Sequence, residues 1–74
     1  MEYADLINNL IAYRKSQNIT TVELAQKMNV SRQSVYNIET LKKAAPDETL
    51  QKMCQALNLE LEIVPKQYNI KSQK

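Results

Sequence analysis

Residues 20–39 read TTVELAQKMNVSRQSVYNIE and contain the start signals of two short helices. Thr20 and Glu23 have the spacing of a capping box, in which the hydroxyl accepts a backbone N–H and the carboxylate reaches back to the cap. Ser31 is suited to cap a second helix in the same way. Because the chain contains no glycine, Asn29 is the residue best suited to a left-handed turn between them. The segment therefore predicts two helices joined by a tight turn.

The second of these helices, expected over 32–39, has little to bury. Val35 and Ile38 are its only aliphatic residues, and its other positions are mainly polar. A helix with so narrow an apolar face must present its remaining side chains to solvent or to a ligand.

Helical patterns continue on both sides of this segment. Residues 3–17 repeat apolar side chains at the spacing of an amphipathic helix. A polar, basic connection over 40–45 leads to a fourth helix that opens at Pro46 or Asp47 and ends at Asn58. The expected core consists of Leu24, Met28, Val35, Ile38, Leu50, Met53 and Leu57.

The period changes after residue 58. Residues 59–65 alternate leucine and isoleucine with glutamate, which predicts a strand that Pro65 ends. Residues 66–74 are polar and basic, and we expect a disordered tail there. A lone strand leaves its backbone groups unpaired. Pairing with a second chain across a two-fold axis is therefore expected, with a frayed tail as the alternative. The expected dimer interface is Leu59, Leu61 and Ile63.

Composition narrows the chemistry that 74 residues of one domain could perform. The chain has no histidine and one cysteine, so we expect no zinc site, no disulfide and no histidine acid–base catalysis. We expect no enzyme activity, no metal and no cofactor. The acidic start and the absence of a long apolar run predict no signal peptide and no membrane span, and hence a cytoplasmic protein.

Charge is unevenly distributed although the net charge is only +2. Residues 14–43 are basic, and the segments on either side of them are acidic. This pattern is typical of one surface that faces a polyanion, and equally of a mixed solvated surface.

Residues 20–39 resemble the helix-turn-helix of the Xre/lambda-repressor-like family. The resemblance rests on Glu-Leu-Ala at 23–25, Val-Ser-Arg at 30–32 and Ile-Glu at 38–39, and it extends over about residues 6–58. Asn29 replaces the usual turn glycine, and Thr40-Leu41 replaces a frequent Asn-Gly. It implies an all-α, four-helix domain over 1–58, followed by the dimerisation strand at 59–65 and the tail at 66–74.

The resemblance also implies which residues contact DNA. In this family the second helix of the motif enters the major groove with its N-terminal residues toward the bases. Arginine suits guanine, and glutamine or asparagine suits adenine. The implied base contacts are Arg32, Gln33, Asn37 and Tyr36. The implied phosphate contacts are Thr20, Thr21, Ser31, Ser34, Lys42 and Lys43. Arg14 and Glu39 match a pair that joins the first helix of the domain to the end of this second helix of the motif, which the family uses as its recognition helix.

The function implied is that of a dimeric transcriptional repressor on a palindromic DNA operator, encoded by a bacterium or a phage. Residues 59–65 also resemble the C-terminal strand of HipB-like antitoxins. This second resemblance predicts an antitoxin that represses its own operon and binds a HipA-type kinase toxin. The alternatives are a phage-type or stand-alone regulator without a toxin, and a protein-interaction module on the same fold.

Overall fold

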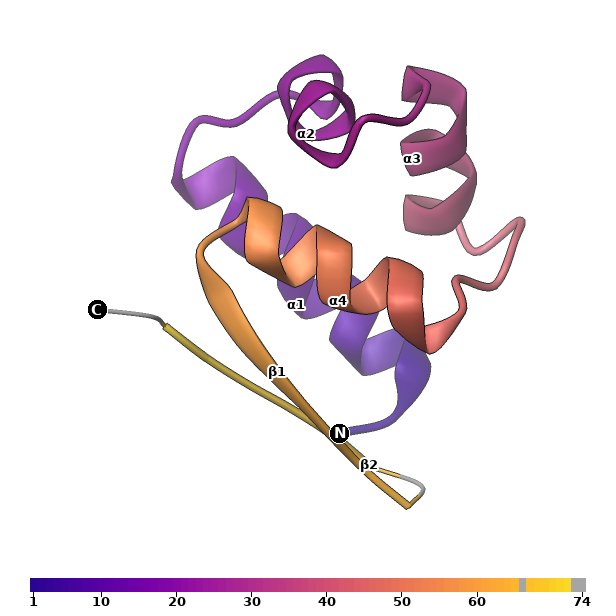
Figure 1. The fold of residues 1–74 in the computed structure, drawn as a ribbon, viewed down its shortest axis with the longest axis vertical. Helices are drawn as coiled ribbons and strands as arrows, with labels where there is room; N and C mark the ends of the chain where they lie inside the picture. Colours follow the sequence, from indigo (N-terminus) through magenta and orange to yellow (C-terminus); the bar gives the residue numbers. More distant parts are fainter. Residues whose placement is uncertain (66, 73–74) are drawn as a thin grey trace.

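The computed structural model describes residues 1–65 and 67–72, which form four helices and a two-stranded sheet. The elements are α1 (Tyr3–Ser16), α2 (Thr21–Met28), α3 (Arg32–Glu39), α4 (Asp47–Ala56), β1 (Leu59–Val64) and β2 (Gln67–Ser72). In Figure 1, α2 and α3 lie at the top, α1 and α4 lie below them, and the β1–β2 hairpin lies at the bottom. The predicted four-helix, mainly helical class is confirmed.

Asparagine provides three of the sharp turns between these elements. Asn18, Asn29 and Asn58 all have left-handed backbones, with φ of 57°, 59° and 58°. Asparagine tolerates this region better than other residues with a side chain because it can hydrogen-bond locally. The left-handed turn predicted at Asn29 is therefore confirmed. Leu41 also adopts this conformation, with φ of 62°, and the sequence did not predict it.

One buried cluster holds the helices together, and it contains every predicted core residue. Its members are Leu6, Ile7, Leu10, Leu24, Ala25, Met28, Val35, Ile38, Ala45, Leu50, Met53, Cys54, Leu57, Leu59 and Leu61. Burial raises the pKa of the Cys54 thiol to about 11, which keeps it protonated at neutral pH. Cys54 is therefore a packing residue.

The C-terminal part of the chain corrects two expectations. β1 pairs antiparallel with β2 of the same chain, with Leu61 opposite Ile70 and Ile63 opposite Tyr68. Residues 67–72 are thus a strand and not a disordered tail, while 66 and 73–74 lie outside the described residues. The backbone groups on the edge of β1 that β2 occupies are therefore hydrogen-bonded without a second chain.

The proposed dimer-interface residues face their own domain. Leu59 and Leu61 belong to the buried core, and the half-buried Ile63 packs against it. Tyr68 and Ile70 of β2 pack against the same cluster. The physical reason is that the chain supplies its own second strand, so these side chains cover its own helices.

A charged pair connects α1 to the end of α3. Arg14 is 7% exposed, and its guanidinium donates to both carboxylate oxygens of Glu39, Nε to Oε2 at 2.7 Å and Nη2 to Oε1 at 3.0 Å. Arg14 Nη1 also donates to the carbonyl of Ile19 at 2.8 Å. The predicted pairing of Arg14 with Glu39 is confirmed.

Because the buried apolar residues share one core, truncating a single buried side chain should cause a large loss of stability. Leu24 and Leu57 are 1% and 2% exposed, so Leu24→Ala or Leu57→Ala should each lower the free energy of unfolding by about 2–5 kcal/mol. Urea denaturation followed by circular dichroism measures this loss. Val22→Ala, at a position 44% exposed, is the control and should change stability by less than about 0.5 kcal/mol. Losses below about 1 kcal/mol at both leucines would contradict the packing.

The Arg14–Glu39 pair predicts a strongly non-additive pair of mutations. Glu39→Ala should cost about 3–5 kcal/mol of stability, because it leaves the Arg14 charge buried without its partner. The double variant Arg14→Met/Glu39→Leu removes both charges and should be more stable than Glu39→Ala alone. The same denaturation measurement tests both. A double variant less stable than Glu39→Ala would contradict this account.

Candidate nucleic-acid interface

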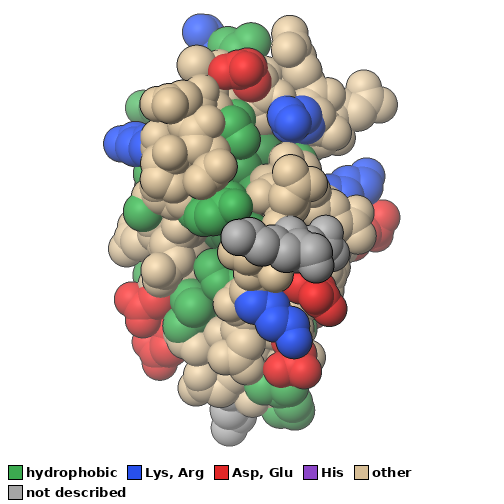
Figure 2. Space-filling view, turned by 90° about the vertical axis from the view of Figure 1, so that its left-hand side faces the viewer, with side chains coloured by type: hydrophobic (Ala, Val, Ile, Leu, Met, Phe, Trp, Pro, Cys, Tyr) green, Lys and Arg blue, Asp and Glu red, His purple; other side chains and the backbone are tan. Residues whose placement is uncertain are grey.

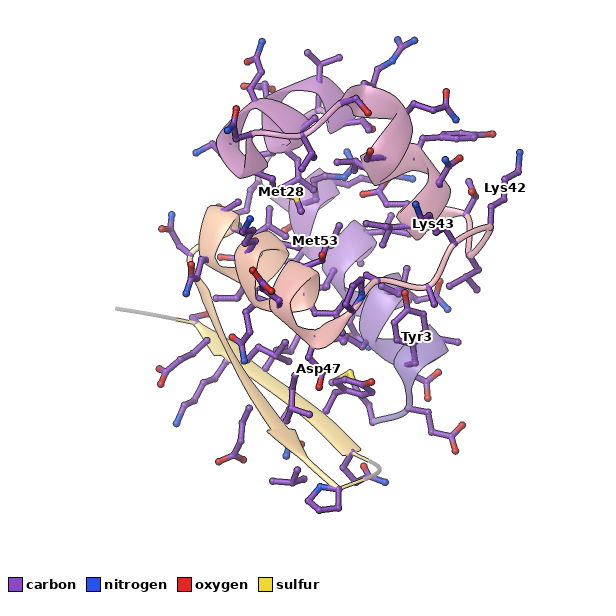
Figure 3. The ribbon with its side chains drawn as sticks, turned by 45° about the vertical axis from the view of Figure 1, so that its right-hand side comes forward. Tyr3, Met28, Lys42, Lys43, Asp47 and Met53 are labelled. Carbon is purple, nitrogen blue, oxygen red and sulfur yellow. The ribbon has the colours of Figure 1, made fainter. Side chains whose placement is uncertain are left out.

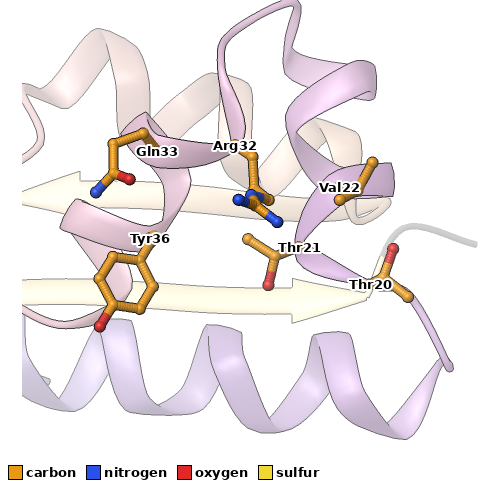
Figure 4. Close-up of a pocket in the computed structure, with 6 residues that line it drawn as sticks. All are labelled: Thr20, Thr21, Val22, Arg32, Gln33 and Tyr36. Atoms are coloured by element: carbon orange, nitrogen blue, oxygen red, sulfur yellow. The ribbon is translucent and has the colours of Figure 1, made fainter.

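Helix α3 packs through one narrow stripe and exposes the rest of its surface. Val35 and Ile38 are 0% and 6% exposed, whereas Arg32, Gln33 and Tyr36 are exposed. These three side chains and the start of α2 line a hollow of about 550 Å³ (Figure 4). The other lining residues are Thr20, Thr21 and Val22. The structure thus brings predicted base-contacting and phosphate-contacting residues together on one concave surface.

The start of α2 is fixed by its own side chains. Thr20 Oγ1 accepts from the Glu23 backbone N–H at 3.1 Å, and Glu23 Oε1 accepts from the Thr20 backbone N–H at 3.0 Å. This is the predicted capping box. Hydrogen bonds from Thr20 hold the pKa of the Glu23 carboxyl below its usual value, so it stays ionised at neutral pH. Thr20 and Thr21 therefore lie at the positive end of a well-formed helix.

The start of α3 is fixed in a similar way. Ser31 Oγ accepts from the Ser34 backbone N–H at 3.1 Å, and the two hydroxyl oxygens lie 2.9 Å apart. Both residues were predicted as phosphate contacts, and the structure shows them bound to each other at the helix cap. The cap positions the adjacent Arg32 at the rim of the hollow.

Two of the predicted base-contacting residues form a hydrogen-bonded pair. Gln33 Nε2 donates to Asn37 Oδ1 at 2.9 Å, one helical turn further along α3. Gln33 is exposed, whereas Asn37 is half-buried and lines a second, smaller hollow of about 290 Å³. Asn37 is therefore set back behind Gln33.

Tyr36 is paired with a lysine from the loop after α3. Lys42 Nζ lies 5.3 Å from the centre of the Tyr36 ring, which is within the range of a cation–π contact. The backbone N–H groups of Lys42 and Lys43 both donate to the Asn37 carbonyl, at 2.9 and 3.1 Å. The left-handed Leu41 allows the loop to turn back to that carbonyl.

The two loop lysines have different surroundings. Lys42 is beside Tyr36 and points away from the domain in Figure 3, whereas Lys43 lines the smaller hollow. Only Lys42 is thus placed next to a residue of the larger hollow. The sequence did not indicate this difference.

The sequence also did not single out Val22. This side chain lines the larger hollow and is 44% exposed. Its position falls outside the apolar stripe that Leu24, Ala25 and Met28 form on α2. The signal available in the sequence was that Val22 is an apolar residue outside the buried stripe of its helix.

Charge differs between α3 and the hairpin. The exposed Glu60 and Glu62 point outward from β1, and the exposed Lys71 of β2 lies opposite Glu60. The hairpin lies below the helices in Figure 1, whereas α2 and α3 lie at the top. Figure 2 shows most acidic groups of the visible face in its lower half, together with a basic group. The exposed Arg32 and Lys42 make the α3 end the one suited to a polyanion.

Within 1–65 and 67–72, no three histidine, cysteine or acidic residues lie close enough to hold a metal ion. None of the helices in this described part is long and apolar enough to cross a membrane.

Comparison with known proteins gives one match. A family model described as helix-turn-helix matches residues 10–64, a span that includes all of α2, α3, α4 and β1. Neither the curated proteins nor the solved structures contain a significant match to the chain. The family match covers well over half of the sequence and includes the helices that line the larger hollow. The chain belongs to the helix-turn-helix family, in its Xre/lambda-repressor-like branch.

Proposed function

We propose that this protein is a sequence-specific transcriptional repressor without enzyme activity. The observation that carries the proposal is the exposed, polar N-terminal half of α3 beside the capped start of α2. A helix of this kind fits the major groove, where the donor and acceptor pattern distinguishes all four base pairs.

In this proposal each element makes a different kind of contact. Arg32 contacts guanine, and Gln33 contacts adenine. The α2 start binds a phosphate through the hydroxyls of Thr20 and Thr21 and the backbone N–H groups of Thr21 and Val22, because the capping box occupies those of Thr20 and Glu23. Lys42, beside Tyr36, binds a phosphate further along the strand. The contacts predicted for Ser31, Ser34 and Lys43 stay predictions.

We further propose that two copies bind a palindromic operator. One recognition helix of 8 residues contacts few base pairs. Two such helices about 34–36 Å apart would contact half-sites on one face of the duplex. Because β1 pairs with β2, the homodimer in this proposal uses a surface other than the edge of β1 that β2 occupies.

The narrower role of an antitoxin stays a prediction from resemblance. It rests on the likeness of residues 59–65 to the HipB-like strand, and the HipA-type kinase partner rests on the same likeness. Pairing of β1 within the chain favours the second candidate, a stand-alone regulator without a toxin. Co-expression with the neighbouring reading frame, followed by affinity purification, separates the two roles.

If Arg32 and Gln33 contact bases, replacing either one should lower DNA affinity by an amount that depends on the DNA sequence. The intact chain selects its preferred duplex from a randomised pool, and affinities are then measured by fluorescence anisotropy. Arg32→Ala and Gln33→Ala should each weaken binding to that duplex by about 1–3 kcal/mol and relax the preference at one base pair. Asn8→Ala, an exposed asparagine of α1, is the control and should bind as the parent does. Parental affinity in both α3 variants would refute the assignment of α3.

The phosphate contact of Lys42 predicts a loss that is independent of sequence. Lys42→Ala should weaken selected and unrelated duplexes alike, and the slope of log affinity against log salt should fall by about 1. Lys71→Ala removes the same charge from the exposed face of β2 and should leave the slope unchanged. Equal effects of the two variants would indicate a general charge effect and no contact at Lys42.

A further inference from the structure

We propose that Asn37 is a positioning residue that makes Gln33 specific for adenine over guanine. The inference rests on the proposed function, and it concerns how the selectivity of one base contact arises. It assigns to Asn37 a role behind Gln33 in place of the independent base contact that the sequence predicted.

The geometry of the two amides carries the inference. Gln33 Nε2 donates to Asn37 Oδ1 at 2.9 Å, and Asn37 is half-buried while Gln33 is exposed. The Asn37 backbone is held as well, because its carbonyl accepts from the N–H groups of Lys42 and Lys43. The Asn37 backbone is thus held at two points, and in this proposal its side-chain oxygen sets which way the amide plane of Gln33 faces.

The hydrogen bond leaves Gln33 with a defined pattern. A glutamine amide has two N–H donors and one carbonyl acceptor. One donor is occupied by Asn37, so one donor and the Oε1 acceptor remain. Adenine presents N7 as an acceptor and N6–H₂ as a donor in the major groove, which complements this pair.

The same pattern disfavours guanine. Guanine presents two acceptors, N7 and O6, and a bidentate contact to it requires two donors. Gln33 offers two donors only if it releases Asn37. With Asn37 in place, Oε1 faces the guanine O6, and two acceptors oppose each other. Without this bond the Gln33 amide could turn either its donors or its acceptor toward the base, so its preference for adenine over guanine would be weaker.

The test compares adenine and guanine at the base pair that Gln33 contacts. That base pair is identified as the one at which Gln33→Ala loses its preference in the duplex selected by the intact chain. Affinities for the adenine and guanine versions are then measured for the parent, Asn37→Ala, Asn37→Asp and the control Asn8→Ala. The parent and the control should prefer adenine by about 5- to 150-fold, the range that one good bidentate contact supplies.

Asn37→Ala should lower this preference to within about threefold, while the preference at the base pair contacted by Arg32 is retained. Retention at the Arg32 position also shows that the variant is folded. Asn37→Asp keeps an acceptor for Gln33 Nε2, so it should keep the adenine preference even though its added charge weakens overall binding. Only a positioning role predicts this rescue of selectivity without rescue of affinity.

Three outcomes would overturn the inference. They are a full adenine preference in Asn37→Ala, a relaxed preference at a different base pair only, and an Asn37→Asp variant as unselective as Asn37→Ala. In each of these cases the proposed DNA-binding function stands. If the intact chain selects no preferred duplex, the proposed function fails and the inference fails with it.

Discussion

The ion pair between Arg14 and Glu39 is the contact on which the placement of the recognition helix depends. Helix α3 has only Val35 and Ile38 in the core, and two side chains do not fix the direction of a helix. Arg14 adds a bidentate contact at the α3 C-terminus and a third bond to the Ile19 carbonyl just before α2. Planar two-point contacts of this kind supply geometric specificity. The pair therefore ties α1, the start of α2 and the end of α3 into one arrangement.

Because the ion pair helps to hold α3 in place, the side chains on the outer surface of α3 are not needed for packing. Its side chains are instead organised by short local contacts: Ser31 with Ser34, Gln33 with Asn37, and Tyr36 with Lys42. Side chains that are already ordered lose less conformational entropy when they bind. The polar surface that looks like a solvated helix face in the sequence is, in the folded protein, a pre-arranged set of donors and acceptors.

The parts of the fold that could be predicted are those determined by neighbouring residues. The Thr20–Glu23 capping box, the left-handed Asn29 and the core repeat of α4 all follow from local spacing. Strand β2 could not be predicted, because its six residues contain only Tyr68 and Ile70 as apolar members and its stability comes from pairing with β1. The left-handed Leu41 belongs to the turn that ends α3, in which the N–H groups of Lys42 and Lys43 reach the Asn37 carbonyl. It could not be predicted because leucine, unlike asparagine, gives no signal for a left-handed backbone. Non-local pairing overrides weak local propensity in β2.

The hairpin and the charges beside α3 have separate roles. Alternation along β1 buries Leu59 and Leu61 and turns Glu60 and Glu62 outward. Lys71 of β2 lies opposite Glu60 and offsets part of that negative charge, so the attraction to phosphates comes from Arg32 and Lys42 beside α3. These positive charges act during approach, before any base is contacted. The alternation that completes the core and the charges that attract DNA are thus carried by different elements of the domain.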